Sequence, residues 1–379
     1  MNEAVGKAAA VGERAIGGAS EQLPLIIVLL LLGLVVALVV GVIWRYIRTT
    51  PADRFVTALA DRDRVAVLMH PNPDPDAMAS AMAVEALADT VDTEAVVQYP
   101  GQIRHPENRA FQTVLDCDFE NIERASELAA SQVVLVDHNE PRGFPGADEI
   151  VPYAVVDHHP GDGDGTAFTD VRPTRGSCSG IFAEYLQQRG WGKARGKDKR
   201  MPSTLATALL YGIQSDTTSF TRGCTDAEFA AAAYLFPYAD SDSLERIANP
   251  QVDSETLDVK ARAISEREVD RSFLVSHVGE ISNRDALPAA ADELVRLEGV
   301  TVAVVTGERD GLLHLSGRSQ DDRVHMGRTL SAALESIPEA SGGGHARMGA
   351  GQAPLSAAST SGSHPELQSQ LFAAMNGEL

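Results

Sequence analysis

Residues 131–140 read SQVVLVDHNE, an apolar run that leads directly into acidic, imidazole and amide side chains. An apolar run without alternation is typical of a strand covered on both faces, as in a parallel sheet. Three further strands are expected at 64–69, 94–98 and 153–156. Helical stretches are expected at 76–89, 179–189 and 202–214. This alternation predicts an α/β fold with a doubly wound parallel sheet.

Polar clusters stand where these buried elements should end. They contain His70, Asp74 and Asp76 after the first strand, Asp137 and His138 after residue 136, Asp157, His158 and His159 after residue 156, and Asp216 after the last helical stretch. Each cluster taken singly is typical of a turn or a helix cap. Because the carboxyl ends of parallel strands share one edge, four clusters at equivalent positions favour a single crevice.

Several carboxylates in one crevice repel one another unless cations balance their charge. Carboxylate and imidazole ligands without thiolates suit Mn²⁺ or Mg²⁺ better than structural zinc. A pair of such ions is typical of phosphoryl transfer, where it holds the attacking and leaving oxygens. The three cysteines, Cys117, Cys178 and Cys224, form no CxxC pair, which argues against a zinc ribbon or a disulfide framework.

A second pattern starts near residue 250. A strand is expected at 300–305, a turn at 308–311 and a hairpin partner at 312–316, followed by a helix at 324–337. The run SGGGH at 341–345 predicts a flexible glycine loop. We therefore expect a first domain over 52–240, a smaller α+β domain over 250–360, and a tail over 361–379 with a last helix at 365–375.

The motifs, in their order along the chain, resemble those of a known family. His-x-x-x-Asp-x-Asp, Val-Asp-His, Asp-His-His and Ser-Asp-Thr resemble the four motifs of the DHH phosphoesterases, and Gly-Gly-Gly-His resembles the signature of their DHH-associated C-terminal domain. The resemblance implies a catalytic domain over 52–240 and a substrate-binding domain over 250–360. It also implies a metal-dependent phosphodiesterase that hydrolyses cyclic di-AMP or short oligonucleotides through a water activated between two metals.

The resemblance further implies roles for individual residues. One divalent ion would be bound by His70 and Asp74, and the other by Asp76, His158 and Asp216, with Asp137 bridging both. The catalytic residues would be Asp137, His159 and Arg318. Substrate would be bound by His159, Ser316, Arg318, Ser319, Gly342, Gly343, Gly344 and His345. Mn²⁺ is the expected metal, with Mg²⁺ or Co²⁺ as alternatives, and no role is assigned to His314 or His325.

Alternative substrates follow from the same resemblance. Enzymes of this kind also act on 3′-phosphoadenosine 5′-phosphate, pyrophosphate or polyphosphate, and residues 136–140 resemble the second motif of manganese-dependent pyrophosphatases. The Gly-Gly-Gly-His domain favours the phosphodiesterases instead. A non-catalytic nucleotide sensor is a further hypothesis, which is disfavoured because every expected ligand position is occupied.

An apolar segment precedes the first domain. Residues 23–44 are 22 uncharged residues, enough to cross a bilayer, whereas a cleaved signal peptide would have a shorter run. Trp44 and Tyr46, with arginines at 45, 48 and 54, are typical of a membrane interface and predict a cytoplasmic body. We expect an extracytoplasmic tail at 1–22 and a single transmembrane helix at 23–47 in the cell membrane.

The composition limits the partners. The 379 residues include 53 Asp and Glu against 32 Lys and Arg, for a net charge of −21, and only five are lysines. This balance resembles that of proteins from salt-loving organisms. It argues against a stable complex with duplex nucleic acid, which needs a basic surface. A small anionic nucleotide in a locally positive cleft remains compatible with it, as does a homodimer.

Overall fold

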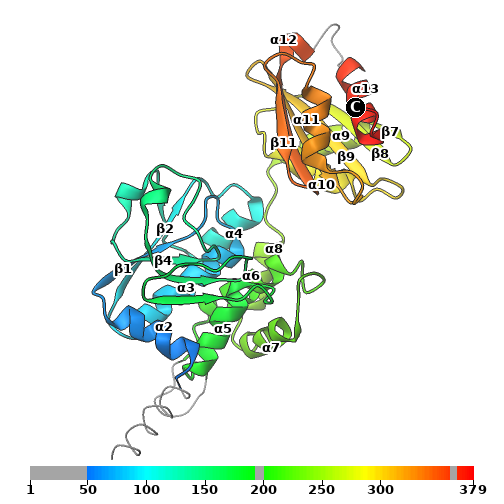
Figure 1. Ribbon diagram of the computed structural model, residues 1–379. Helices are drawn as coiled ribbons and strands as arrows, with labels where there is room; N and C mark the ends of the chain where they lie inside the picture. Colours follow the sequence, from blue (N-terminus) through cyan, green and yellow to red (C-terminus); the bar gives the residue numbers. More distant parts are fainter. Residues whose placement is uncertain (1–48, 193–199, 359–364) are drawn as a thin grey trace, which may run out of the picture. The chain divides into compact units, whose positions relative to one another are not determined.

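The computed structural model describes residues 49–192, 200–358 and 365–379. Its contacts divide the chain into a first unit, Met1–Ile103 with Phe111–Glu245, and a second unit, Arg104–Ala110 with Arg246–Leu379 (Figure 1). The expected tail at 1–22 and membrane helix at 23–47 lie outside the described residues. Among the helices that are described, none is both long and apolar enough to cross a membrane.

The first unit is built on a six-stranded sheet in the order β3-β2-β1-β4-β5-β6, and every neighbouring pair is parallel. The order reverses between β1 and β4, as in a doubly wound sheet, so the chain runs outward in both directions from this point. The expected parallel α/β sheet is therefore confirmed. The strands are β1 (Arg64–Leu68), β2 (Glu94–Pro100), β3 (Glu120–Ile122), β4 (Val133–Val136), β5 (Pro152–Asp157) and β6 (Phe168–Val171).

The central strands are apolar because they are covered on both faces. All residues of β4 and β5 are buried, and β1 exposes only its first residue. The edge strands β3 and β6 were not predicted, since they are short and carry polar or exposed residues that give no apolar run. The polar residues of the central part are thus confined to the strand ends.

Helices cover this sheet and fix the segments that follow the strands. They are α2 (Pro51–Ala60), α3 (Pro75–Asp89), α5 (Cys178–Gln188), α6 (Ser203–Asp216) and α7 (Asp226–Leu235), while α4 (Pro106–Val114) and α8 (Ser241–Ala248) each contain residues of both units. At the start of α3, one carboxylate oxygen of Asp74 accepts hydrogen bonds from the backbone N–H groups of Asp76 and Ala77, both 3.0 Å long. This cap and Pro75 in the first turn set where the helix begins.

Helices α3, α5 and α6 approach one another closely beside the end of β1. Gly212 of α6 lies so near the others that a Cβ there would stand 2.2 Å from Ser179 Oγ and 3.2 Å from Asp76 Cα. Glycine is therefore required at this helix contact for steric reasons rather than for its conformational freedom. The close approach holds Asp76 and Asp216 on neighbouring helices.

The second unit contains a mixed six-stranded sheet in the order β11-β12-β10-β9-β8-β7, in which only β8 and β9 pair in parallel. Helices α9 and α10 pack on one face of this sheet, and α11 and α13 pack on the other. The elements are α9 (Ser254–Ser265), β7 (Arg267–Asp270), β8 (Phe273–Glu280), α10 (Ala286–Leu294), β9 (Val302–Arg309), β10 (Leu312–Ser319), α11 (Met326–Leu334), β11 (Ser341–Gly344), β12 (Met348–Pro354), α12 (Leu355–Ala358) and α13 (Pro365–Asn376).

The glycine run departs from the sequence expectation. Residues 341–344 form the edge strand β11, paired antiparallel with β12, instead of a flexible loop. The prediction was wrong because glycine has little strand propensity of its own, and the pairing partner supplies the order. The segment 361–379, expected to be a tail, includes α13, whose Leu367 and Leu371 belong to the core of this unit.

We predict that Gly212→Ala destabilises the protein by about 1–3 kcal/mol, because the added methyl group overpacks the helix contact. Intrinsic helix propensity alone would favour alanine by about 1 kcal/mol. The sign of the change in the free energy of unfolding therefore shows whether packing or propensity dominates. Urea denaturation would measure the change.

The double variant Gly212→Ala/Ser179→Ala removes the 2.2 Å contact and should recover about half of the loss. Ser179→Ala alone should have little effect, because its buried hydroxyl has no hydrogen-bond partner among the described residues. A stabilised Gly212→Ala protein would contradict the steric explanation.

Candidate active site

The sequence-predicted metal ligands of the first unit meet beside the reversal point of the sheet. His70, Asp74 and Asp76 follow β1, Asp137 follows β4, His158 follows β5, and Asp216 ends α6. Their ligand atoms form two groups, one of His70, Asp74 and Asp137, the other of Asp76, Asp137, His158 and Asp216. Within each group the atoms lie within 4.8 Å of one another, and Asp137 belongs to both.

Asp137 lies at the centre of the cluster. It is 1% exposed, and neither carboxylate oxygen has a hydrogen-bond partner among the described residues. Its Oδ1 is 3.3 Å from His158 Nε2 and its Oδ2 is 3.5 Å from His70 Nε2. Its φ of 62° lies in the left-handed region, which is uncommon for a residue with a side chain and is often found at functional sites. A buried carboxylate with free lone pairs fits cation binding.

The first group is oriented by the backbone. His70 Nδ1 donates to the Pro71 carbonyl at 3.1 Å, which leaves Nε2 to face the acids. That Nε2 lies 3.7 Å from Asp74 Oδ2. Asp74 uses its other oxygen, Oδ1, to cap α3. Asp74 therefore stabilises the helix and offers a ligand oxygen at the same time.

The second group has the same arrangement. His158 Nδ1 donates to the Arg175 carbonyl at 3.2 Å, so Nε2 faces Asp216 Oδ2 at 3.1 Å and Asp76 Oδ2 at 3.8 Å. The fully buried Asp76 carboxylate accepts two 2.7 Å hydrogen bonds from the backbone N–H groups of Cys178 and Ser179. These two residues begin α5, whose positive end stabilises a buried carboxylate.

The charge in the cluster shifts the pKa values strongly. Burial disfavours charged imidazoles, but the negative charge of the surrounding carboxylates outweighs it, and it raises the pKa of His70 to about 11 and that of His158 to about 12. Burial and the neighbouring carboxylates raise the pKa of Asp76 and of Asp216. The carboxylates thus attract positive charge, which divalent cations would supply in place of protons.

His159 adjoins the two groups, with its Nδ1 3.7 Å from Asp137 Oδ1, and forms a third group of possible ligands with Asp137 and His158. It is held by partners that the sequence did not identify. Its Nδ1 donates to Asp157 Oδ1 at 2.9 Å, and this hydrogen bond outweighs burial and raises its pKa. Asp157 is fully buried, and its other oxygen accepts from Asn139 Nδ2 at 2.8 Å. The Asn139–Asp157 pair therefore fixes the half-exposed imidazole of His159 with Nε2 directed away from Asp157. Both residues lie in the sequence clusters, but their spacing gave no indication of this contact.

His138 has a different environment although it adjoins Asp137. It is 2% exposed, and its Nδ1 donates to the Val136 carbonyl at 2.9 Å. Burial lowers its pKa to about 4, so the ring is neutral at pH 7. Its ring packs edge-on against His70, with centroids 6.3 Å apart. His138 therefore supports the position of His70.

The predicted substrate-binding residues of the second unit separate into two sets. Ser316, Gly342 and Gly343 line a groove of about 610 Å³, whereas Arg318, Ser319, Gly344 and His345 lie outside its lining in the part of the chain that the structure describes. Arg318 is bound by both oxygens of Asp292, with its Nε 2.5 Å from Oδ1 and its Nη2 3.3 Å from Oδ2. Ser319 closes a local turn with Asp321. Asp292 was missed because only the fold brings α10 beside β10.

The donor set fits hard divalent cations. Each group combines one imidazole with two or three carboxylates and contains no thiolate. Both imidazoles have their second nitrogen fixed by a backbone carbonyl, as is usual for metal-binding histidines. The orphaned buried atoms of the cluster, both oxygens of Asp137 and Nε2 of His158, face its interior.

Comparison with known proteins agrees with this geometry. Residues 64–213 match the DHH family, N-terminal domain, and residues 270–374 match the DHHA1 domain. An uncharacterized protein of Methanocaldococcus jannaschii is 36% identical over 290 residues, which cover 76% of this chain and 58% of that protein. A cyclic-di-AMP phosphodiesterase of Geobacillus thermodenitrificans is 26% identical over 289 residues, which cover 70% of this chain and 42% of that protein.

The chain therefore spans about half the length of these curated relatives. Among solved structures, an exopolyphosphatase-related protein from Bacteroides fragilis shares the fold, with a TM-score of 0.61 at 16% identity over 86% of this chain and 96% of that chain. The two domain matches together cover about two thirds of the chain. The chain therefore carries the DHH family N-terminal domain followed by the DHHA1 domain.

Proposed function

We propose that this protein is a metal-dependent phosphodiesterase that hydrolyses cyclic di-AMP or short oligonucleotides. The observation that carries the proposal is the pair of ligand groups that share the buried Asp137. A shared carboxylate is the arrangement expected for two cations close together, and such pairs serve phosphoryl transfer.

His70, Asp74 and Asp137 would hold one cation, and Asp76, Asp137, His158 and Asp216 the other. Bound divalent ions would make a water molecule more acidic and neutralise phosphate oxygens. The absence of thiolates supports Mn²⁺, with Mg²⁺ or Co²⁺ as alternatives.

His159 and Arg318 would act on the phosphate itself. With its Nδ1 hydrogen bonded to Asp157, His159 can offer Nε2–H to a phosphate oxygen where negative charge develops. Water attacks phosphorus, the P–O bond to the ribose breaks, and the leaving oxygen takes a proton, which yields a 5′-nucleotide and a free hydroxyl. Arg318 must exchange its hydrogen bonds to Asp292 for a substrate oxygen if it is to take part.

The choice of substrate rests on the second unit and on one relative. A cyclic-di-AMP phosphodiesterase matches 70% of the chain, and the Gly-Gly-Gly strand presents bare backbone on a groove that is large enough for a nucleotide. Residues 136–140 support pyrophosphate or polyphosphate as the second candidate.

We also propose that residues 23–47 anchor the protein in the cell membrane with its catalytic body in the cytoplasm, on the basis of the uncharged stretch at 23–44.

With Mn²⁺, the protein should convert cyclic di-AMP or the linear dinucleotide pApA into nucleotide products. Asp137→Asn should lower kcat by at least about a hundredfold, because an amide cannot replace a carboxylate between two cations. Asparagine tolerates left-handed backbone, so the fold should remain. Each protein is incubated with these substrates and also with 3′-phosphoadenosine 5′-phosphate and pyrophosphate, and the products are separated by chromatography. This measures both the substrate preference and the loss of kcat in Asp137→Asn.

The matched control is Asp63→Asn, an exposed carboxylate ahead of β1, which should keep full activity. Orthophosphate from pyrophosphate alone would favour the second candidate. Full turnover by Asp137→Asn would contradict the shared-ligand role.

Metal binding should release protons and strengthen as pH rises. Since the pKa values of His70 and His158 are raised to about 11 and about 12, both imidazoles are charged at pH 7 and must lose a proton to bind a cation. We expect release of at least about two protons per chain, measured by calorimetry in buffers of different ionisation enthalpy.

His138→Gln serves as the control for this measurement. Its ring, with a pKa of about 4, is already neutral at pH 7, so the number of protons released should not change. Heats that do not depend on the buffer would contradict the proposed ligand set.

Gly343→Ala should lower kcat/KM without lowering the melting temperature. A Cβ at Gly343 meets no atom within 4 Å and its φ is not left-handed, so the fold accepts it, but the methyl group would enter the groove. At Gly342, by contrast, a Cβ would stand 2.8 Å from the Leu330 carbonyl oxygen, so Gly342→Ala should destabilise the fold. Unchanged kinetics for Gly343→Ala would argue against substrate on this strand.

A further inference from the structure

The histidines of the two ligand groups are oriented by carbonyls at very different distances along the chain. His70 Nδ1 donates to the carbonyl of Pro71, its immediate neighbour. His158 Nδ1 donates to the carbonyl of Arg175, which is 17 residues away. A neighbouring carbonyl stays beside its histidine, whereas a distant carbonyl can orient an imidazole only if its own loop is fixed. The second group therefore depends on the contacts that hold Arg175.

Arg175 closes a tight turn that begins directly after β6 and is called here the 172–175 turn. Its backbone N–H donates to the Arg172 carbonyl at 2.9 Å. Pro173 occupies the second position of this turn, where its fixed φ is favourable. The Arg172 N–H donates to the Asp157 carbonyl at 2.9 Å, at the end of β5. The backbone thus ties the first residue of the turn to the strand that leads into the histidine.

One carboxylate on α5 binds both arginine side chains of the turn. Glu184 Oε2 accepts from Arg172 Nη1 at 2.9 Å and from Arg175 Nη2 at 2.5 Å. Its other oxygen accepts from Gln188 Nε2 at 2.9 Å. The side chains of the three charged residues are at most 29% exposed, so solvent screens these charge-assisted hydrogen bonds less than it screens surface ion pairs. Glu184 therefore holds the two ends of the turn together.

A second carboxylate fixes the guanidinium of Arg172. Asp170 Oδ1 and Oδ2 accept from its Nε and Nη2 at 2.8 and 2.7 Å, a two-point contact that sets the plane of the guanidinium. The buried Tyr185 donates its hydroxyl to the same carboxylate at 2.5 Å. Because Asp170 anchors Arg172 independently, the particular contribution of Glu184 is to hold Arg175.

Helix α5 thereby supports two ligands of the second group. Its first turn donates two backbone N–H groups to the Asp76 carboxylate. Further along the same helix, Glu184 holds the turn whose carbonyl orients His158. Ligands that are supported by one rigid element keep a fixed spacing, which a cation site requires.

We propose that Glu184 is a positioning residue for the second cation. By binding Arg175, it keeps the carbonyl of that residue within reach of His158 Nδ1, and the imidazole then directs Nε2 at the ligand cluster. The inference rests on the proposed two-cation function and adds to it a residue that acts through His158. The effect should fall on the second group alone, because His70 has its own neighbouring acceptor.

The test titrates Mn²⁺ into the metal-free full chain and compares wild type with Glu184→Gln, which keeps the size of the side chain but loses its charge. Calorimetry gives the affinities of both cation sites without any turnover. One Mn²⁺ affinity should fall by about tenfold or more, the usual effect of removing a group that orients a metal-binding histidine, while the other should stay within about twofold of wild type. The Mn²⁺ concentration for half-maximal hydrolysis of pApA should rise by the same factor.

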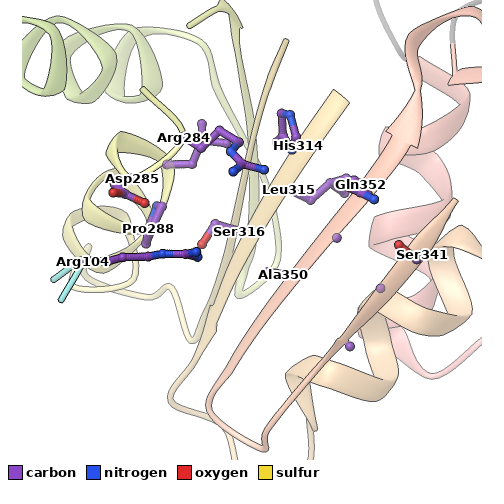
Figure 2. Close-up of a pocket in the computed structure, with 14 residues that line it drawn as sticks. Arg104, Arg284, Asp285, Pro288, His314, Leu315, Ser316, Ser341, Ala350 and Gln352 are labelled. Carbon is purple, nitrogen blue, oxygen red and sulfur yellow. The ribbon is translucent and has the colours of Figure 1, made fainter. Parts of the chain in front are cut away.

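The KM for pApA at saturating Mn²⁺ should keep its wild-type value. Figure 2 shows the groove of the second unit, with His314, Ser316 and Gln352 among its lining residues. Glu184 belongs to the first unit, so its substitution leaves that groove unchanged. A general loosening of the protein would instead alter both Mn²⁺ affinities together. The selective fall of one affinity therefore separates positioning from overall stability.

Glu94→Gln is the matched control, since it removes the same charge and also breaks a two-point contact with an arginine. Glu94 binds Arg64 at the beginning of β2 and β1, at the edge of the sheet opposite the ligand cluster. Both Mn²⁺ affinities of this variant should keep their wild-type values.

Arg175→Gln breaks the same contact from the other side, and it decides the test if Glu184→Gln does not fold. It should weaken the same single affinity, and the double variant should bind Mn²⁺ no more weakly than Glu184→Gln, because both changes remove one contact. Unchanged affinities, or an equal fall of both, would overturn the inference, and continued hydrolysis of pApA would then leave the proposed function intact. A selective fall of one affinity without hydrolysis of any dinucleotide would support the positioning role and contradict the proposed function.

Discussion

The burial of one carboxylate constrains the whole first unit. Asp137 lies at the end of a fully buried strand with both oxygens unpartnered among the described residues, and such a group is costly in a protein interior. Positively charged groups around Asp137 offset the free energy of burying its carboxylate. Two imidazoles present their Nε2 atoms to Asp137, and two backbone carbonyls keep those rings in place.

The topology of the sheet makes this arrangement possible. Strands covered on both faces have no polar surface along their length, so polar side chains gather at the strand ends. The reversal of strand order between β1 and β4 leaves a crevice at that edge, and the loops after β1, β4 and β5 all reach it. Helix α5 adds the two backbone N–H groups that stabilise the Asp76 carboxylate. These N–H groups are free to bind it because they belong to the first turn of a helix.

Much of this could be predicted from the sequence, because continuous apolar runs and the clusters after them are local signals. The central strands, the parallel α/β class and the meeting of the acidic clusters follow from such signals. The contacts between distant residues do not. Asp157 with Asn139, and Asp292 with Arg318, are polar pairs that only the fold defines. The strand formed by residues 341–344 depends likewise on β12, since glycine contributes no strand preference.

Asp74 shows how two demands can leave a position with almost no freedom to vary in evolution. Its Oδ1 caps α3, a task that asparagine, serine or threonine performs equally well. Its Oδ2 faces the His70 imidazole in the ligand cluster, where an amide or hydroxyl lacks the charge. Glutamate has the charge but is a poor cap. Of the twenty amino acids, aspartate alone meets both demands. Any substitution at this position therefore loses either the helix cap or the negative charge in the ligand cluster.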